Sequence, residues 1–155
     1  MLNILLAVDG SESSLAAVRH ALRLVEGGLS ASFVLANVQA PATVYEMLTA
    51  QDPEVLDKVS AGAGEHQLEA AAALLAAAGV PFEQEVASGE PGHVLAEMIE
   101  RYAIDAVIMG AHRSGLTRSA VAGSAAQWLL AHTEVPVTVV RPVAAGEGEG
   151  VSEGE

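Results

Sequence analysis

The chain of 155 residues contains no cysteine, which excludes disulfide bonds, catalysis by a thiolate and cysteine-ligated metal sites. Aromatic residues make up only 3% of the chain, although hydrophobic residues make up 51%. The core must therefore be built mainly from Ala, Val and Leu, whose small side chains let helices lie close to a sheet. Positive charge is also scarce, because 7 Lys and Arg stand against 20 Asp and Glu, for a formal net charge of −13. Such a field repels nucleic acids and anionic membrane surfaces, so we expect neither as a partner.

No apolar run approaches the roughly 18 residues of a membrane-spanning helix. The N-terminal run ends at Asp9-Gly10 and has no basic segment, which predicts a first strand and not a signal peptide. We expect one cytoplasmic domain over residues 1–143. Residues 144–155 form an acidic Gly/Glu tail with too little apolar surface to fold, and we predict that it is disordered.

The hydrophobic pattern predicts alternating strands and helices. Apolar runs at 3–8, 31–38 and 106–109 predict buried strands, and the alternation over 82–87 predicts an edge strand. The segment 136–141, bracketed by prolines, predicts the last strand. Helical spacing predicts helices within 15–25, 65–78, 94–99 and about 119–132, with Ser11 or Ser13 as the cap of the first. The stretch 43–60 is ambiguous, and Gly62 and Gly64 weaken helix after it. This order predicts an α/β fold, a three-layer α/β/α sandwich around a five-stranded parallel sheet.

One junction carries the strongest functional signal. The apolar run 106–109 ends in glycine and polar residues, and a helical pattern opens again near Gly123-Ser124. A strand followed by a loop and a helix start is where α/β proteins bind phosphate. The loop also holds His112, Arg113 and Arg118 in a chain that is poor in cations. We expect an anion at this loop, and we expect the loop 9–13 after the first strand to lie on the same side of the sheet.

Five segments together resemble the universal stress protein family, up to Arg141. They are Ile4–Ser11, Ser88–Gly92, Asp105–His112, Gly123-Ser124 and Val135–Arg141. The resemblance implies a Rossmann-like fold of the adenine nucleotide alpha hydrolase-like type, with strand order 3-2-1-4-5. It also implies a homodimer joined through the last strand, with an interface formed by Val137, Thr138, Val139, Val140 and Arg141.

The same resemblance implies an adenine nucleotide, ATP, as the ligand. Asp9 and the Val8 backbone would meet the nucleoside, and Val38 would lie against adenine. Gly110, Gly123 and Ser124 would hold the phosphates. The full predicted set is Ala7, Val8, Asp9, Val38, Met109, Gly110, His112, Arg113, Gly115, Gly123, Ser124 and Ala125.

Arg113 departs from the family pattern, because it stands where the nucleotide-binding branch carries a second glycine, and Gly115 does not restore the spacing. Its guanidinium would either clash with the phosphates or bind them. The other site residues have structural readings as well. Asp9 could only hold amides of its turn, Gly110 could be a turn residue, and Gly123-Ser124 could be a tight helix contact with a cap.

The leading hypothesis is a homodimeric stress sensor or regulator that binds ATP, with Mg²⁺ carried by the phosphates and no protein-built metal site. Any catalysis would be at most slow ATP hydrolysis, since the chain has no Gly-x-x-x-x-Gly-Lys-Ser/Thr loop and no Gly-x-Ser-x-Gly elbow. One alternative is an interaction module without nucleotide binding, in which Arg113 fills the phosphate pocket. Another is an enzyme of the wider adenine-nucleotide α/β group that transfers or activates a small acid.

Overall fold

The computed structural model describes residues 1–39, 53–113 and 120–142. At its centre lies a parallel sheet of five strands in the order β3-β2-β1-β4-β7. The predicted fold class and strand order are therefore confirmed, with β7 as the fifth strand of the prediction. The strands are β1 (Leu2–Ala7), β2 (Ala31–Gln39), β3 (Phe82–Ser88), β4 (Ala106–Gly110) and β7 (Val137–Val140).

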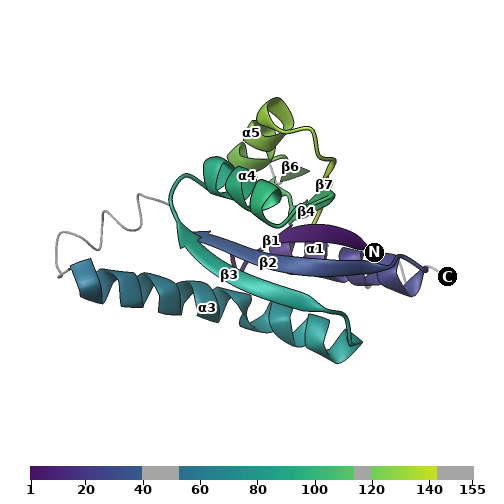
Figure 1. The fold of residues 1–155 in the computed structure, drawn as a ribbon, viewed down its shortest axis with the longest axis horizontal. Helices are drawn as coiled ribbons and strands as arrows, with labels where there is room; N and C mark the ends of the chain where they lie inside the picture. Colours follow the sequence, from purple (N-terminus) through teal and green to yellow (C-terminus); the bar gives the residue numbers. More distant parts are fainter. Residues whose placement is uncertain (40–52, 114–119, 143–155) are drawn as a thin grey trace.

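Helices cover both faces of this sheet (Figure 1). The helices α1 (Glu12–Glu26) and α3 (Pro53–Ala78) lie on one face, and α4 (Pro91–Arg101) and α5 (Ser124–His132) lie on the other. Consecutive residues of β1 serve opposite faces, since Ile4 and Leu6 pack with α1 and α3 whereas Leu5 packs with α4 and α5. Burial on both faces explains why the central strands are continuous apolar runs.

The outer strand β3 shows the opposite pattern. None of its residues is fully buried, and only β2 pairs with it. This matches the edge strand predicted from the alternation of polar and apolar residues. One predicted cap is confirmed too, because the Ser11 hydroxyl accepts a hydrogen bond from the Ser14 amide at 3.2 Å and begins α1.

Helix α3 differs from the sequence prediction. It runs without a break through Gly62 and Gly64, which were expected to weaken helix. A Cβ atom at position 64 would lie 2.3 Å from Val86 Cγ1 and 2.8 Å from Asn37 Oδ1, so only glycine lets the helix lie this close to β2 and β3. Tertiary packing outweighs the low helix propensity of glycine at this position.

The helix predicted from about residue 119 begins only at Ser124. Before it, β6 (Ala120–Val121) pairs antiparallel with β5 (His112–Arg113), directly after β4. These backbone groups are used in strand pairing and cannot also form the first turn of a helix. The two short strands bring the start of α5 back to the end of β4.

The helices α4 and α5 meet at Gly92. A Cβ atom there would lie 2.8 Å from Trp128 Cδ2, so glycine lets the helices approach. The indole of Trp128 lies between the imidazoles of His93 and His132, at ring-centroid distances of 4.5 Å and 4.0 Å.

We expect Gly64→Ala to lower the free energy of unfolding by about 1–3 kcal/mol, because the added methyl group overpacks the contact with Val86. Gly62→Ala is the matched control, since no atom lies within 4 Å of its added Cβ. That control should raise stability by about 0.5–1 kcal/mol through helix propensity. Urea denaturation of the variants measures both effects. Equal stabilities for Gly64→Ala and Gly62→Ala would contradict the packing role of Gly64.

Candidate functional site

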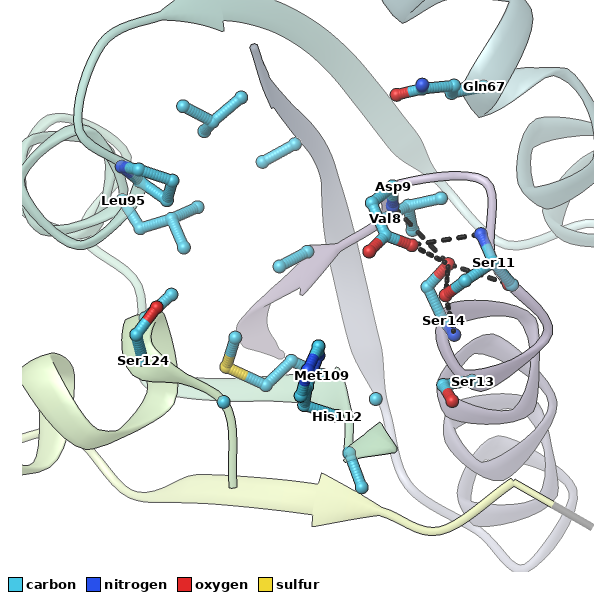
Figure 2. A pocket seen from close by; sticks show the side chains of 18 of the residues that line it. Val8, Asp9, Ser11, Ser13, Ser14, Gln67, Leu95, Met109, His112 and Ser124 are labelled. Carbon is cyan, nitrogen blue, oxygen red and sulfur yellow. Dashed lines mark hydrogen bonds between the residues drawn. The ribbon is translucent and has the colours of Figure 1, made fainter. Parts of the chain in front are cut away.

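A cavity of about 620 Å³ lies at the carboxyl ends of the central strands. The strands β1 and β4 are neighbours, and the chain leaves β1 toward the α1 face and β4 toward the α5 face. This reversal of strand order is where open α/β sheets form ligand crevices. Figure 2 shows the cavity between the start of α1, the end of β4 and the start of α5.

The cavity brings together ten of the twelve residues predicted to bind nucleotide. They are Ala7, Val8, Asp9, Val38, Met109, Gly110, His112, Gly123, Ser124 and Ala125. The backbone of Arg113 pairs with Ala120 in the β5-β6 ladder, but its side chain lies outside what the structure describes. Gly115 and Arg118 lie outside the described residues too. The binding roles of all twelve remain predictions.

Nine further residues line the cavity and were absent from the predicted set. They are Ser11, Ser13, Ser14, Ala36, Gln39, Gln67, Pro91, Leu95 and Ala111. A signal existed for some, because Gln39 is a polar residue directly after an apolar strand and the serines follow Asp9 in the loop. Gln67 gave no such signal, since it lies inside an alanine-rich helix far from the junction in sequence.

Asp9 is fixed by the turn between β1 and α1. Its Oδ1 accepts hydrogen bonds from the Ser11 amide at 2.9 Å and from the Ser14 hydroxyl at 3.1 Å, and its own amide donates to Ser14 Oγ at 3.3 Å. Gly10 makes the turn possible with φ of +86°, a left-handed conformation that favours glycine. The dashed lines in Figure 2 mark this network at the first turn of α1.

These bonds decide the charge of Asp9. Partial burial raises the pKa of its carboxyl, but hydrogen bonds from the Ser11 hydroxyl and amide and from Ser14 outweigh this, so the pKa lies below its ordinary value. Asp9 is therefore charged at neutral pH. Within the described residues no group donates to its Oδ2, which leaves that atom for a ligand or for water.

The opposite side of the cavity offers positive potential from the backbone at the start of α5. Gly123 is the N-cap of α5 with extended backbone (φ −70°, ψ 173°), and no side chain caps the helix. Of the pair Gly123-Ser124, which could also be read as a cap, Gly123 is the N-cap and Ser124 is the first helical residue. No described group accepts from the amides of Ser124 and Ala125, which line the cavity. Free amides and the helix dipole favour a negatively charged group at this end.

The two glycines at this junction have different physical reasons. A Cβ atom on Gly110 would lie 2.4 Å from the backbone of Ser13, so glycine is needed there for the packing of β4 against α1. The contact with Ser13 by itself explains why this position is glycine. A Cβ atom on Gly123 would lie 3.3 Å from His112 Cβ, which is tight but not forbidden. Gly123 therefore keeps the space between His112 and the α5 amides open.

Metal-ligating side chains do not cluster in the described part of the chain. No three His, Asp or Glu residues there lie close enough together to hold a metal ion. None of the helices in this part is both long enough and apolar enough to span a membrane.

Comparisons with known proteins agree with this geometry. The model of the universal stress protein family matches residues 1–141. No curated protein matches the chain significantly. Among solved structures, the hypothetical protein MJ0577 superimposes with a TM-score of 0.76 at 20% identity, covering 93% of this chain and 98% of that one.

Two further solved structures are named for their ligands. A universal stress protein family protein from Arabidopsis thaliana with AMP bound has a TM-score of 0.66 at 19% identity, covering 94% of this chain and 95% of that one. A universal stress protein in complex with cAMP has a TM-score of 0.64 at 20% identity, covering 92% and 98%. At these identities the likeness shows the shared fold.

We predict that Ser14→Ala raises the pKa of Asp9 toward its ordinary value, because one donor to Oδ1 is lost. A lowered pKa stabilises the fold above the unfolded-state pKa, about 3.9, and this contribution disappears as pH falls through the folded-state pKa. The unfolding free energy of Ser14→Ala should therefore fall less steeply below about pH 4 than that of the wild type.

Ser14→Ala should also cost about 1 kcal/mol at neutral pH for the lost hydrogen bonds. Urea denaturation between neutral and acidic pH gives both quantities, and carboxyl NMR titration gives the Asp9 pKa directly. Ser30→Ala, at an exposed position at the other end of the sheet, is the control. An Asp9 pKa identical in the wild type and Ser14→Ala would contradict the role of Ser14.

Proposed function

The chain belongs to the universal stress protein family, and on that basis we propose that its cavity binds an adenine nucleotide, which is ATP in the cell. We also propose that the protein is a homodimeric cytoplasmic sensor or regulator. The observation that carries the proposal is the uncapped start of α5, whose free amides face the same cavity as the ends of β1 and β2. An anionic group and a planar apolar group could therefore be held at opposite sides of one cavity.

The cavity is large enough for such a ligand. Its volume of about 620 Å³ lies within the range of small-molecule sites, roughly 300–1,000 Å³. Apolar side chains of Ala36, Val38 and Leu95 line the part beside β2 and α4, whereas His112 and Ser124 line the part beside α5. Family members with AMP or cAMP bound support an adenine nucleotide as the ligand class.

The edge of β7 supports the proposed dimer. The carbonyls of Pro136 and Val140 accept from the amides of Val107 and Ala111 and so point toward β4. Because backbone groups alternate along a strand, those of Val137 and Val139 point away from β4, at the last strand of the sheet. A short apolar strand with such groups favours pairing with a second copy. Thr138 and Arg141 lie exposed beside it.

The nucleotide proposal is tested by calorimetric titration with ATP and AMP. We expect Gly123→Val to lower the affinity for both at least about tenfold, because the side chain fills the space between His112 and the α5 amides. Ala131→Val, at an exposed position near the other end of α5, is the matched control and should bind like the wild type. Wild-type protein that binds no adenosine phosphate at millimolar concentration would refute the proposal.

The same titration with Arg113→Gly separates the proposal from an interaction module whose own arginine occupies the pocket. We expect this variant to bind ATP more weakly, because a guanidinium near phosphates forms strong charge-assisted hydrogen bonds. A rise in ATP affinity of more than tenfold, about 1.4 kcal/mol, would favour the interaction module instead.

We predict that Val139→Lys weakens dimerisation, because it places a charge in the apolar edge of β7. Sedimentation equilibrium or light scattering after size-exclusion chromatography would show the mass falling toward the monomer of 15.8 kDa. Ser30→Lys adds the same charge at an exposed position of the described chain and should leave the mass unchanged. Circular dichroism checks that both variants are folded. An unchanged dimer mass for Val139→Lys would reject this interface.

A further inference from the structure

Three side-chain amides form a connected cluster at the β2 side of the cavity. Asn37 Nδ2 donates to the Val8 carbonyl at 2.9 Å and to Gln67 Oε1 at 2.6 Å. Gln39 Nε2 donates to Asn37 Oδ1 at 2.6 Å and to Gln67 Oε1 at 3.2 Å. Asn37 and Gln39 are only 1% and 7% exposed, so the bonds to Val8 and between these two side chains are buried, whereas those to Gln67 are partly buried. The cluster joins the ends of β1 and β2 to helix α3.

Two polar atoms of the amide cluster, Gln39 Oε1 and Gln67 Nε2, form no hydrogen bond with another described residue. Both hydrogens of Asn37 Nδ2 and of Gln39 Nε2 are used, and Gln67 Oε1 accepts twice. In the described chain no group donates to Gln39 Oε1, and none accepts from Gln67 Nε2. Gln39 and Gln67 both line the cavity. Within the described residues, one amide oxygen and one amide nitrogen of this cluster are therefore available to a polar partner.

The fold holds Gln67 in place at two close contacts. Gly64, one turn earlier in α3, lets the helix approach Asn37 and Val86. On the other side, Gly10 leaves room for the Gln67 stem, because a Cβ atom on Gly10 would lie 3.0 Å from Gln67 Cγ. Figure 2 shows the Gln67 side chain extending from α3 on the side of the cavity away from Ser124. The packing at these two glycines therefore restricts where the Gln67 side-chain amide can lie.

The cluster and the α5 amides lie at opposite ends of the cavity. The strands β2 and β4 flank β1, so their ends are separated by two strand spacings, roughly 10 Å. With an anion held at α5, the amide cluster faces the part of the ligand farthest from the phosphate. In a nucleotide that part is the base.

We infer that Gln39 and Gln67 select the base by offering one acceptor and one donor to its edge. Gln39 Oε1 accepts from an exocyclic amino group, and Gln67 Nε2 donates to the adjacent ring nitrogen. Adenine presents this pair, whereas guanine presents a carbonyl oxygen beside a ring N–H, in the reverse order. The inference rests on the proposed nucleotide site and assigns its base specificity to side chains from β2 and α3.

Gln67→Glu is the sharpest variant. It keeps the oxygen that accepts from Asn37 and Gln39, and it removes only the donor. Gln67→Met removes both the acceptor oxygen and the donor amide without adding charge. Calorimetric titration with AMP should show at least about tenfold weaker binding for both variants. Ribose 5-phosphate, which has the same phosphate and no base, should bind each variant within about twofold of the wild type. It therefore controls for the added charge and for folding of the phosphate end.

A titration of the wild-type protein with an altered ligand tests the same inference and does not depend on the folding of a variant. The 5′-monophosphate of purine riboside lacks the amino group of AMP and should bind at least about tenfold more weakly than AMP. Equal affinities of the wild type for these two ligands, or AMP binding by both Gln67 variants within about twofold of the wild type, would overturn the inference and leave the nucleotide site standing. Wild-type protein that binds neither AMP nor ribose 5-phosphate would refute the nucleotide site itself, and the inference with it.

Discussion

Parallel pairing of β1 with β4 is the constraint on which the site depends. The register sets Ala7 beside Met109, so the two strands end side by side. The chain then leaves them toward opposite faces of the sheet, and no described helix closes the gap between the two exits. The turn at Asp9 and the junction at Gly110 thereby become two walls of one cavity.

Charge is distributed unevenly between those walls. Although the chain has a net charge of −13, the α5 end of the cavity presents backbone amides and a helix dipole that suit an anion. The other wall contains Asp9, whose hydrogen bonds lower its pKa and keep it ionised. A phosphate group would be repelled from the Asp9 side and attracted to the start of α5. This polarity would orient a nucleotide before any base-specific contact forms.

The periodicity of hydrophobic residues and the positions of Gly, Pro and other turn residues were sufficient to predict most of the fold. The apolar runs of the central strands β1, β2 and β4 reflect their burial, whereas the more polar β3 lies at the edge of the sheet. The predictions failed where packing outweighs local preference. Gly64 lies inside a helix because β2 and β3 leave no room for a side chain, and residues 120–121 pair with β5 before α5 begins.

The residues of the candidate site also divide into those that local sequence predicts and those that depend on tertiary packing. Residues next to strand ends, such as Asp9 and Gly123, could be predicted, because the carboxyl edge of a parallel sheet gathers them. Gln67 could not, since its place in the cavity depends on how far α3 lies from β2, a distance set by contacts between segments remote in sequence. Nor could the contact of Gly110 with Ser13 be anticipated from the loop sequence alone.

Trp128 gives the molecule a natural optical probe. It is the only tryptophan of the chain, it packs on Gly92 of the neighbouring helix, and two imidazole rings flank its indole. Its emission therefore comes from one site, on the short helix whose first residues face the cavity. Fluorescence therefore reports the local packing of the α4-α5 pair without any attached dye.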